Sequence, residues 1–375
     1  AGALIFAYML ELFKKYKMPL LYRSISLAFF ALFPIFPMYA VTATKDMLFG
    51  LVFIWMAMEL WQAIKEGAWS VKRGILFVVS GLIFCLLRNN GFYILLVFAL
   101  ATPIFFRKKL KLKTFVLCLV PLFVYQIMIL KILFPALEIE NGSKREMLSV
   151  PFQQVARYAY VWGDKGLSQE DVDHLDRILQ FDGDMKVLAE NYNSTWADPI
   201  KARFNKEASS QDLKVFMNTW LKMVKKHPIT AIEAFLKNNF LLTSSKGCGK
   251  IVYVNQIESA SQSYNWYGIT ETKGGSGVRQ TLSKVLEYMS NIPILGLFFS
   301  ALTYNFLLAF FMVYFLVKRQ YDKFLLVTLF ALCIGTMLLG PIIYMRYMIP
   351  GIMAVPLYGG IAMVRNENKK EEENG

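Results

Sequence analysis

Long apolar segments separated by short polar connections make up most of the chain. A helix needs about 20 apolar residues to cross a bilayer core of about 30 Å, and most of these segments approach that length. The pattern therefore predicts an all-α polytopic membrane protein with about nine transmembrane helices, the first of them partial. The predicted segments are Ala1–Phe13, Leu20–Val41, Met47–Ile64, the two arms of Gly74–Phe106, Thr114–Phe134, Ile292–Val317, Phe324–Tyr344 and Met348–Val364.

The apolar pattern stops between Pro135 and about Tyr288, where polar residues dominate. A stretch of this length is enough for a fold of its own. We predict a mainly helical extracytoplasmic domain over residues 135–290, between N-terminal transmembrane helices (1–134) and C-terminal ones (291–364). A charged cytoplasmic tail (365–375) follows.

Helix signals recur within the predicted domain. Ser168 is followed three residues later by Asp171, which is typical of a helix N-cap. Ser209 or Ser210 opens another predicted helix, which His227-Pro228 ends.

The distribution of charge fixes the predicted orientation. The chain has 41 Lys and Arg against 27 Asp and Glu, a net charge of +14, and 56% of its residues are hydrophobic. The basic residues gather in every second connection, which is the positive-inside pattern of a membrane protein and places the C-terminus in the cytoplasm. The large loop is roughly balanced in charge, so no basic face remains for nucleic acid. The clusters are Lys14, Lys15 and Lys17; Lys65, Lys72 and Arg73; Arg107 to Lys113; Lys318, Arg319 and Lys323; and Arg365, Lys369 and Lys370.

The sequence begins without Met, in the middle of an apolar run. We expect the natural protein to begin earlier, with at least one upstream span and its outer loop.

The hairpin Gly74–Phe106 carries a polar apex, Arg88-Asn89-Asn90-Gly91. Each arm is roughly 16 residues, or about 24 Å of helix, which is short for a full span. We expect Arg88, Asn89 and Asn90 to lie below the outer surface in a polar cavity, where they bind substrate. The alternative is that Arg88 only extends to the lipid headgroups.

Three cations, Lys45, Arg88 and Arg346, fall at the predicted outer ends of helices, where the positive-inside rule does not place them. Together they can clamp one polyanion. A lipid-linked phosphate or diphosphate suits them, because arginine offers a two-pronged donor to phosphate while the lipid tail lies in the bilayer. The alternative is three unrelated interface anchors.

Asp46 directly follows Lys45 on the short outer turn. Its carboxylate is a candidate general base toward an acceptor hydroxyl, or a ligand for a divalent metal. The alternative is an N-cap for the helix that starts at Met47.

Gln154 and Arg157 share one face of a predicted aromatic, amphipathic helix over Pro151–Trp162. They are candidates for contact with a sugar or phosphate. The alternative is that they are ordinary surface polar residues.

Four motifs stand out in the sequence. They are Thr44-Lys45-Asp46-Met47-Leu48-Phe49, Arg88-Asn89-Asn90-Gly91-Phe92-Tyr93, Val150-Pro151-Phe152-Gln153-Gln154-Val155-Ala156-Arg157-Tyr158, and His227-Pro228 before Ile232-Glu233-Ala234. These motifs resemble a family of bacterial multi-pass membrane proteins of unknown function, and that family in turn resembles the GT-C glycosyltransferases, which use polyprenyl-phosphate sugars. The resemblance covers nearly the whole chain.

The resemblance implies transfer with inversion from a lipid phosphate, with an outer carboxylate acting on the acceptor and basic residues stabilising the leaving phosphate. In the superfamily the principal catalytic Asp usually lies in the first outer loop, which we expect upstream of Ala1. Asp46 matches a secondary acidic position.

We therefore predict a glycosyltransferase of the bacterial cytoplasmic membrane. It would transfer a sugar from a polyprenyl-phosphate donor to a cell-surface glycan or lipid acceptor on the outer face. Two alternatives stay open: a flippase of a lipid-linked glycan, which would use the same phosphate clamp, and a non-catalytic protein of cell-envelope assembly.

Overall fold

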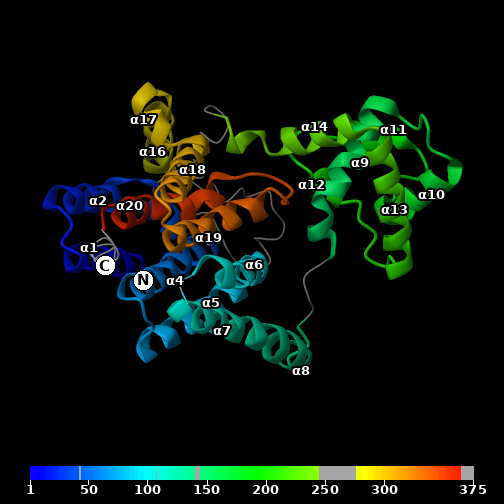
Figure 1. Ribbon diagram of the computed structural model, residues 1–375. Coiled ribbons are helices and arrows are strands. Elements are labelled where there is room, and N and C mark those ends of the chain that lie inside the picture. Colours follow the sequence, from blue (N-terminus) through cyan, green and yellow to red (C-terminus); the bar gives the residue numbers. More distant parts are fainter. Residues whose placement is uncertain (42–43, 107, 140–143, 245–275, 365–375) are drawn as a thin grey trace. The chain divides into compact units, whose positions relative to one another are not determined.

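The computed structural model describes residues 1–41, 44–106, 108–139, 144–244 and 276–364, and these residues form helices joined by turns (Figure 1). Within these ranges no β-strand is present, and the extended pairing amounts to two isolated bridges, Asn193 with Trp196 and Trp196 with Ile342. The predicted all-α class is confirmed. The chain divides into a first unit (1–131, 245–334 and 345–375) and a second unit (132–244 and 335–344).

The elements of the first unit include the long apolar helices, shorter helices and turns. They are α1 (Gly2–Lys15), α2 (Leu20–Leu32), α3 (Ile35–Val41), α4 (Asp46–Glu66), α5 (Val71–Leu87), α6 (Asn90–Phe105), α7 (Lys108–Phe123), the π-helix η1 (Val124–Leu133), α16 (Ser276–Asn291), α17 (Pro293–Phe298), α18 (Ala301–Val317), α19 (Tyr321–Met337), the 3₁₀ turn η4 (Met345–Met348) and α20 (Ile349–Met363).

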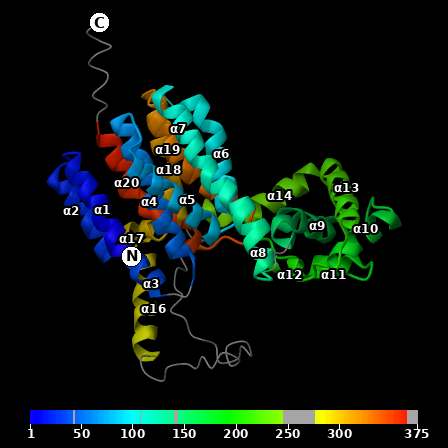
Figure 2. The ribbon, with the colours of Figure 1, turned by 90° about the horizontal axis from the view of Figure 1, so that it is seen from below.

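Helix α4 is the central element of the first unit, and it packs against α1, α5 and α20 (Figure 2). Phe53 and Trp61 on α4 are fully buried. Gly50 is the close-approach point: a Cβ there would lie 3.0 Å from Ile349 Cγ2 and 3.2 Å from Met353 Sδ. Helix α4 is therefore covered by protein on several sides.

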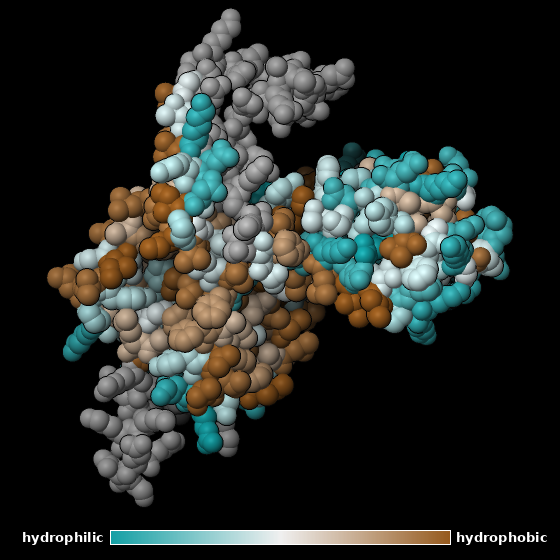
Figure 3. Space-filling view, turned by 90° about the horizontal axis from the view of Figure 1, so that it is seen from above, coloured by the Kyte–Doolittle hydropathy of each residue, from teal (hydrophilic) through white to brown (hydrophobic). Residues whose placement is uncertain are grey.

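Two helical stretches, Asp46–Glu66 and Leu110–Ala136, are long and apolar enough to cross a membrane. Three shorter apolar helices accompany them, Leu20–Leu32, Asn90–Phe105 and Ala301–Val317. Large apolar side chains such as Leu100 and Phe306 are exposed on the first unit. Figure 3 shows hydrophobic side chains over much of the visible face of this unit. This surface is consistent with association with a membrane.

Three predicted segments are interrupted or end early. Leu20–Val41 is interrupted where Phe33 leaves the helical conformation before Pro34. The segment Ile292–Val317 was predicted as one helix, and this was wrong, because α17 ends at Phe298 and α18 begins after Ser300. The segment Phe324–Tyr344 was also predicted too long: α19 ends at Met337, and Gly340-Pro341 cannot continue a helix.

The second unit is a set of shorter helices around α9. Its elements are α8 (Phe134–Ala136), the 3₁₀ turn η2 (Lys144–Leu148), α9 (Ser149–Trp162), α10 (Gln169–Leu179), α11 (Met185–Glu190), α12 (Asp198–Lys201), α13 (Ser210–Lys226), α14 (Pro228–Asn238) and the 3₁₀ turn η3 (Phe240–Leu242). Its core includes Phe152, Leu175, Phe181, Leu188 and Phe216, all fully buried.

Capping residues set the helix ends of the second unit as predicted. Ser168 and Asp171 form a reciprocal capping box at the start of α10, and Ser209 and Asp212 form another at α13. Helix α13 ends at His227, and Pro228 occupies the first position of α14, where its missing N–H costs nothing.

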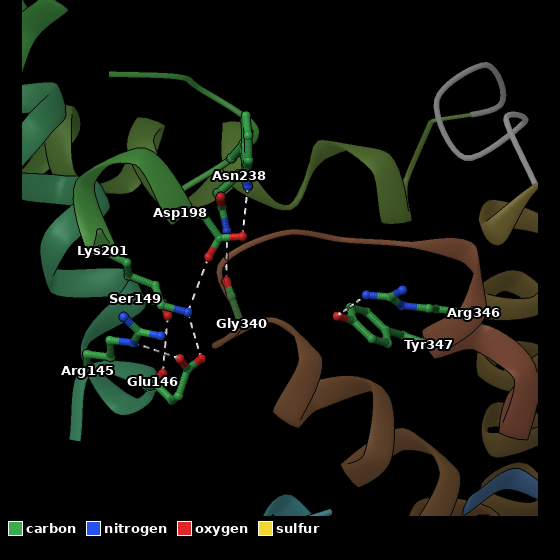
Figure 4. A network of polar contacts seen from close by, with 10 residues as sticks. Arg145, Glu146, Ser149, Asp198, Lys201, Asn238, Gly340, Arg346 and Tyr347 are labelled. Atoms are coloured by element: carbon green, nitrogen blue, oxygen red, sulfur yellow. Dashed lines mark hydrogen bonds and ion pairs between the residues drawn. The ribbon is translucent and has the colours of Figure 1, made fainter. Parts of the chain in front are cut away.

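The second unit differs in extent from the predicted domain of residues 135–290. Residues 245–275 lie outside the described residues, as does the predicted tail 365–375, and α16 belongs to the first unit. Residues 335–344 join the second unit instead: Asn238 Nδ2 donates to the Gly340 carbonyl at 3.1 Å, and the Ala197 amide donates to the Pro341 carbonyl at 2.8 Å (Figure 4). Hydropathy places this segment in an apolar run, so its contacts were not predictable.

A buried lysine stabilises one side of the second unit. Lys201 is 6% exposed, and its ammonium contacts Glu146 at 2.6 Å and Asp198 at 3.2 Å (Figure 4). The contact with Glu146 ties η2 to α12, and the two carboxylates together neutralise a cation that burial would otherwise penalise.

Candidate functional site

Asp46 occupies the first turn of α4 and is 6% exposed. The helix begins at Asp46 with Lys45 as its N-cap residue, and no side-chain cap bond is present there. The alternative that Asp46 is the N-cap is therefore wrong, because the helix starts one residue earlier than predicted and Asp46 is its first residue. A carboxylate in the first turn is still favoured by the positive end of the helix dipole.

Arg88 comes to Asp46 from the turn between α5 and α6. Its Nη1 donates a hydrogen bond to Asp46 Oδ1. Its guanidinium lies over two rings, 4.7 Å from the Tyr347 centroid and 5.7 Å from that of Phe49. A guanidinium stacked on aromatic faces is fixed in orientation as well as in charge.

The tight turn that presents Arg88 depends on Gly91. Arg88 itself is extended, with φ of −148° and ψ of 131°, and α6 starts two residues later at Asn90. A Cβ on Gly91 would lie 2.7 Å from the Phe84 carbonyl oxygen, which is closer than real contacts allow. The predicted apex is therefore a close contact between the ends of two helices.

Arg346 reaches the same carboxylate from η4. Its Nε lies 3.5 Å from Asp46 Oδ2. Its Nη2 donates to the Tyr347 hydroxyl at 3.4 Å, and its guanidinium lies 5.2 Å from the Tyr347 ring centroid (Figure 4). The side chain of Arg346 is 32% exposed and that of Arg88 is 20% exposed.

We name Asp46, Arg88, Arg346 and Tyr347 the Asp46 cluster; all four residues belong to the first unit. One carboxylate and two guanidinium groups give the cluster a formal charge of +1, and the adjacent Lys45 is exposed. Two of the three predicted cations are therefore brought together. Sequence reasoning missed Tyr347, although its position directly after Arg346 was a signal.

The two apex amides lie beside the cluster in sequence. Asn89 is exposed, and its Oδ1 accepts a hydrogen bond from the Tyr125 hydroxyl at 3.3 Å. Asn90 is half-buried and opens α6. Their contact with substrate stays a prediction.

Gln154 and Arg157 lie in the second unit, and both make hydrogen bonds within it. Gln154 Nε2 donates to the Ala231 carbonyl at 3.1 Å, and its Oε1 accepts from Trp220 Nε1 at 2.8 Å. Arg157 pairs with Glu233 and contacts the Tyr192 hydroxyl at 3.4 Å. These contacts join α9 to α13 and α14, and a role in binding sugar or phosphate stays a prediction.

Arg157 and Glu233 change each other's pKa. Burial by itself lowers the pKa of Arg157, but its hydrogen bonds to Glu233 and Tyr192 outweigh burial, so the pKa is raised. The same hydrogen bond and the charge of Arg157 lower the pKa of Glu233. Both groups are therefore charged at neutral pH, as an ion pair requires.

The described residues contain no group of three or more His, Cys, Asp and Glu side chains that could hold a metal ion. Both oxygens of Asp46 face arginines. The possible divalent metal therefore has no candidate ligand set in the described part of the chain.

A second polar cluster lies further along α4. Glu59 is fully buried, and its Oε1 accepts hydrogen bonds from the Tyr8 hydroxyl and Trp55 Nε1, both at 3.1 Å. Gln62 Nε2 donates to the same Tyr8 hydroxyl at 2.7 Å. These contacts tie α1 to α4 through a polar group inside an otherwise apolar helix.

Comparison with known proteins gives a family and no function. No curated protein and no solved structure matches the chain. One family model, described as a family of unknown function, matches residues 2–375. Because that match covers essentially the whole sequence, the chain belongs to this family of unknown function, DUF6020.

Proposed function

We propose that the protein is an integral-membrane glycosyltransferase that moves a sugar from a polyprenyl-phosphate donor to a glycan or lipid acceptor. The observation that carries the proposal is the Asp46 cluster, in which a buried carboxylate is held by Arg88 and Arg346. The transfer needs a carboxylate that acts on the acceptor hydroxyl and cations that stabilise the leaving phosphate, and the cluster holds both kinds of group.

The arginines would bind the donor phosphate. Each guanidinium can offer two parallel N–H donors to phosphate oxygens. The two groups remain partly exposed, so an anion can approach them from outside the protein. As the bond between the anomeric carbon and the phosphate oxygen breaks, negative charge grows on the phosphate, and fixed cations stabilise that change.

Asp46 would act on the acceptor. A phosphate that takes over the arginine N–H groups leaves the Asp46 carboxylate free to accept a proton from the acceptor hydroxyl. The acceptor oxygen then bonds to the anomeric carbon from the face opposite the phosphate, and the phosphate departs with the bonding electrons. Asp46 ends the step protonated, and the configuration at the anomeric carbon is inverted.

The membrane setting supplies the donor. We propose about nine spans in the cytoplasmic membrane, with the C-terminus in the cytoplasm and the second unit outside, following the basic connections. The Asp46 end of α4 then lies at the outer surface. A prenyl tail can remain in the bilayer while its phosphate reaches the cluster.

The test uses the full-length natural protein in liposomes with polyprenyl-phosphate-linked radiolabelled sugars. We expect loss of label from the lipid with the wild type, and loss of that activity in Asp46→Asn and Arg88→Ala. Asp173→Asn and Arg177→Ala, both exposed on α10, are matched controls that should stay active.

Each other outcome supports a different function. Label that crosses the bilayer intact on its lipid, without release, would identify a flippase and make the arginines a transport clamp. Neither release nor crossing would point to a non-catalytic assembly protein. Full activity in both Asp46→Asn and Arg88→Ala would exclude the cluster as the site.

A further inference from the structure

Helix α14 carries an exposed apolar stripe. Ile229, Ile232, Leu236 and, in the following turn η3, Phe240 are 72%, 57%, 60% and 55% exposed. Spacings of three and four residues place Ile229, Ile232 and Leu236 on one face of α14. These three exposed apolar side chains, followed by Phe240 in η3, are an unusual surface for a polar domain and mark a site of interaction.

The opposite face of α14 explains why the stripe points outward. Thr230, Ala231, Ala234 and Asn238 are buried, and the helix packs against α9. Gln154 and Arg157 of α9 fix it further through the Ala231 carbonyl and Glu233. Helix α14 is therefore held rigidly by one side, so the stripe cannot turn into the core of its own unit.

The charges around the stripe suit an anionic surface. Lys225 and Lys226, at the end of α13, and Lys237 on α14 are all exposed. The one acidic residue of α14, Glu233, is paired with the buried guanidinium of Arg157. Helix α14 thus carries one exposed cation, Lys237, two more directly precede it in the chain at the end of α13, and its carboxylate is paired with Arg157.

A lipid surface is within reach of the second unit. The chain enters this unit at Ile132, inside the stretch Leu110–Ala136 that is long and apolar enough to cross a membrane. Ile132, Leu133 and Leu137 at its end are exposed as well. The chain therefore passes from the end of a candidate span, at Ala136, to η2 of the second unit, which begins at Lys144.

We propose that α14 lies flat on the outer membrane surface, with its apolar stripe in the boundary between headgroups and acyl chains and its lysines among anionic headgroups. Basic amphipathic helices bind membranes in this way. The proposal rests on the membrane placement given under the proposed function. It would hold the second unit at the lipid surface, where a lipid-linked donor travels.

The test places a fluorescent label on the stripe. In the full-length protein with its natural cysteines changed to serine, Ile232→Cys is labelled with bimane and reconstituted into liposomes of phosphatidylcholine and phosphatidylglycerol that contain doxyl lipids. Asp173→Cys, exposed on α10, is the control. We expect quenching at position 232 to exceed that at position 173 at least threefold, and to weaken when phosphatidylglycerol is left out.

Three outcomes would overturn the proposal. Equally weak quenching at both positions, in protein that resists carbonate extraction, would refute the docking of α14 and leave the proposed function untouched. Release of the protein by carbonate would refute the membrane placement, and with it the proposed function. Disulfide dimers of unlabelled Ile232→Cys would show that a second copy of the chain covers the stripe.

Discussion

Nε of Arg346 lies 3.5 Å from Oδ2 of Asp46, while Arg88 holds the other oxygen of the same carboxylate. The two arginines come from different parts of the first unit, the turn between α5 and α6 and the turn η4. A buried carboxylate costs free energy unless cations and hydrogen bonds compensate it. Here two guanidinium groups face one carboxylate, so one positive charge is left over. An incoming phosphate would meet that positive charge.

Arg88→Lys tests whether phosphate binding depends on the planar guanidinium of Arg88 or on its positive charge alone. Lysine keeps the positive charge, but it cannot stack on Tyr347 or offer two parallel donors. We expect the affinity for radiolabelled polyprenyl phosphate to fall roughly tenfold, about 1.4 kcal/mol, in equilibrium binding. Arg177→Lys on α10 should bind as the wild type does. Unchanged affinity in Arg88→Lys would show that the positive charge at this position is enough and that the planar guanidinium is not needed.

Gly91→Ala tests the turn that positions Arg88. The added methyl group would lie 2.7 Å from the Phe84 carbonyl oxygen, so the ends of α5 and α6 must separate. We expect a loss of about 1–3 kcal/mol in stability, the usual cost of overpacking, with a lower melting temperature in detergent. Gly335→Ala on α19 is the matched control, because nothing lies within 4 Å of its Cβ position. Equal melting temperatures for the two variants would contradict the role of Gly91.

Glu59 tests the polar link between α1 and α4. Glu59→Leu removes the oxygen that accepts from Tyr8 and Trp55, and it leaves two partly buried donors without that partner. A fully buried donor left unpaired costs about 1–3 kcal/mol, so we expect a loss toward the lower end of that range and a lower melting temperature. Glu59→Gln keeps an acceptor oxygen and should lose less. A leucine variant as stable as the glutamine variant would show that the link contributes little.

Acid should weaken the second unit through Asp171. Burial alone would raise the pKa of Asp171, but the hydrogen bonds from Lys222 and Ser168 outweigh burial and hold the pKa below its usual value of 3.8. A carboxyl group whose pKa is lower in the folded than in the unfolded state stabilises the folded state. This stabilisation is complete at a pH above the unfolded-state pKa, and it is lost as the pH falls through the folded-state pKa. Unfolding of the second unit, followed by calorimetry, should shift to lower temperature below about pH 4.

The control for this pH effect lies on the same helix. Asp171→Asn should unfold at a lower temperature than the wild type at neutral pH and lose less stability on acidification. Exposed Asp173→Asn should follow the wild-type curve at every pH. If the curves of wild type and Asp171→Asn stay parallel, Asp171 does not carry the acid sensitivity.

Local signals in the sequence predicted the parts of the fold that depend on neighbouring residues. The capping pair at Ser168, the helix that opens after Ser209, its end at His227-Pro228 and the hairpin around Arg88 all follow from groups within a few residues of each other. Caps and tight turns are decided by nearby donors and acceptors, so a single sequence is enough to find them.

Contacts between residues far apart in the chain could not be predicted from the sequence. Lys45, Arg88 and Arg346 were grouped because all three fall at one predicted membrane surface, but nothing indicated that Asp46 would pair with both Arg88 and Arg346. The side-chain partners of Gln154 also come from α13 and α14. Pairing of this kind depends on how helices pack, which the pattern of one helix does not contain.

The segment 335–344 offers the last test, because it joins the second unit and leads directly into Arg346. Two amide donors hold it: Asn238 Nδ2 contacts the Gly340 carbonyl at 3.1 Å and Asn239 Nδ2 contacts the Leu338 carbonyl at 3.2 Å. Aspartate has the same shape as asparagine but cannot donate, so the variant Asn238→Asp with Asn239→Asp places two carboxylates against carbonyl oxygens. We expect hydrogen exchange of the peptide covering 335–344 to rise roughly tenfold, for a loss of about 1.4 kcal/mol. Asn218→Asp, exposed on α13, should leave exchange unchanged. Protection that survives in the double variant would mean that the Ala197 amide and the bridge from Trp196 to Ile342 suffice to hold the segment, and Arg346 would then be anchored without Asn238 and Asn239.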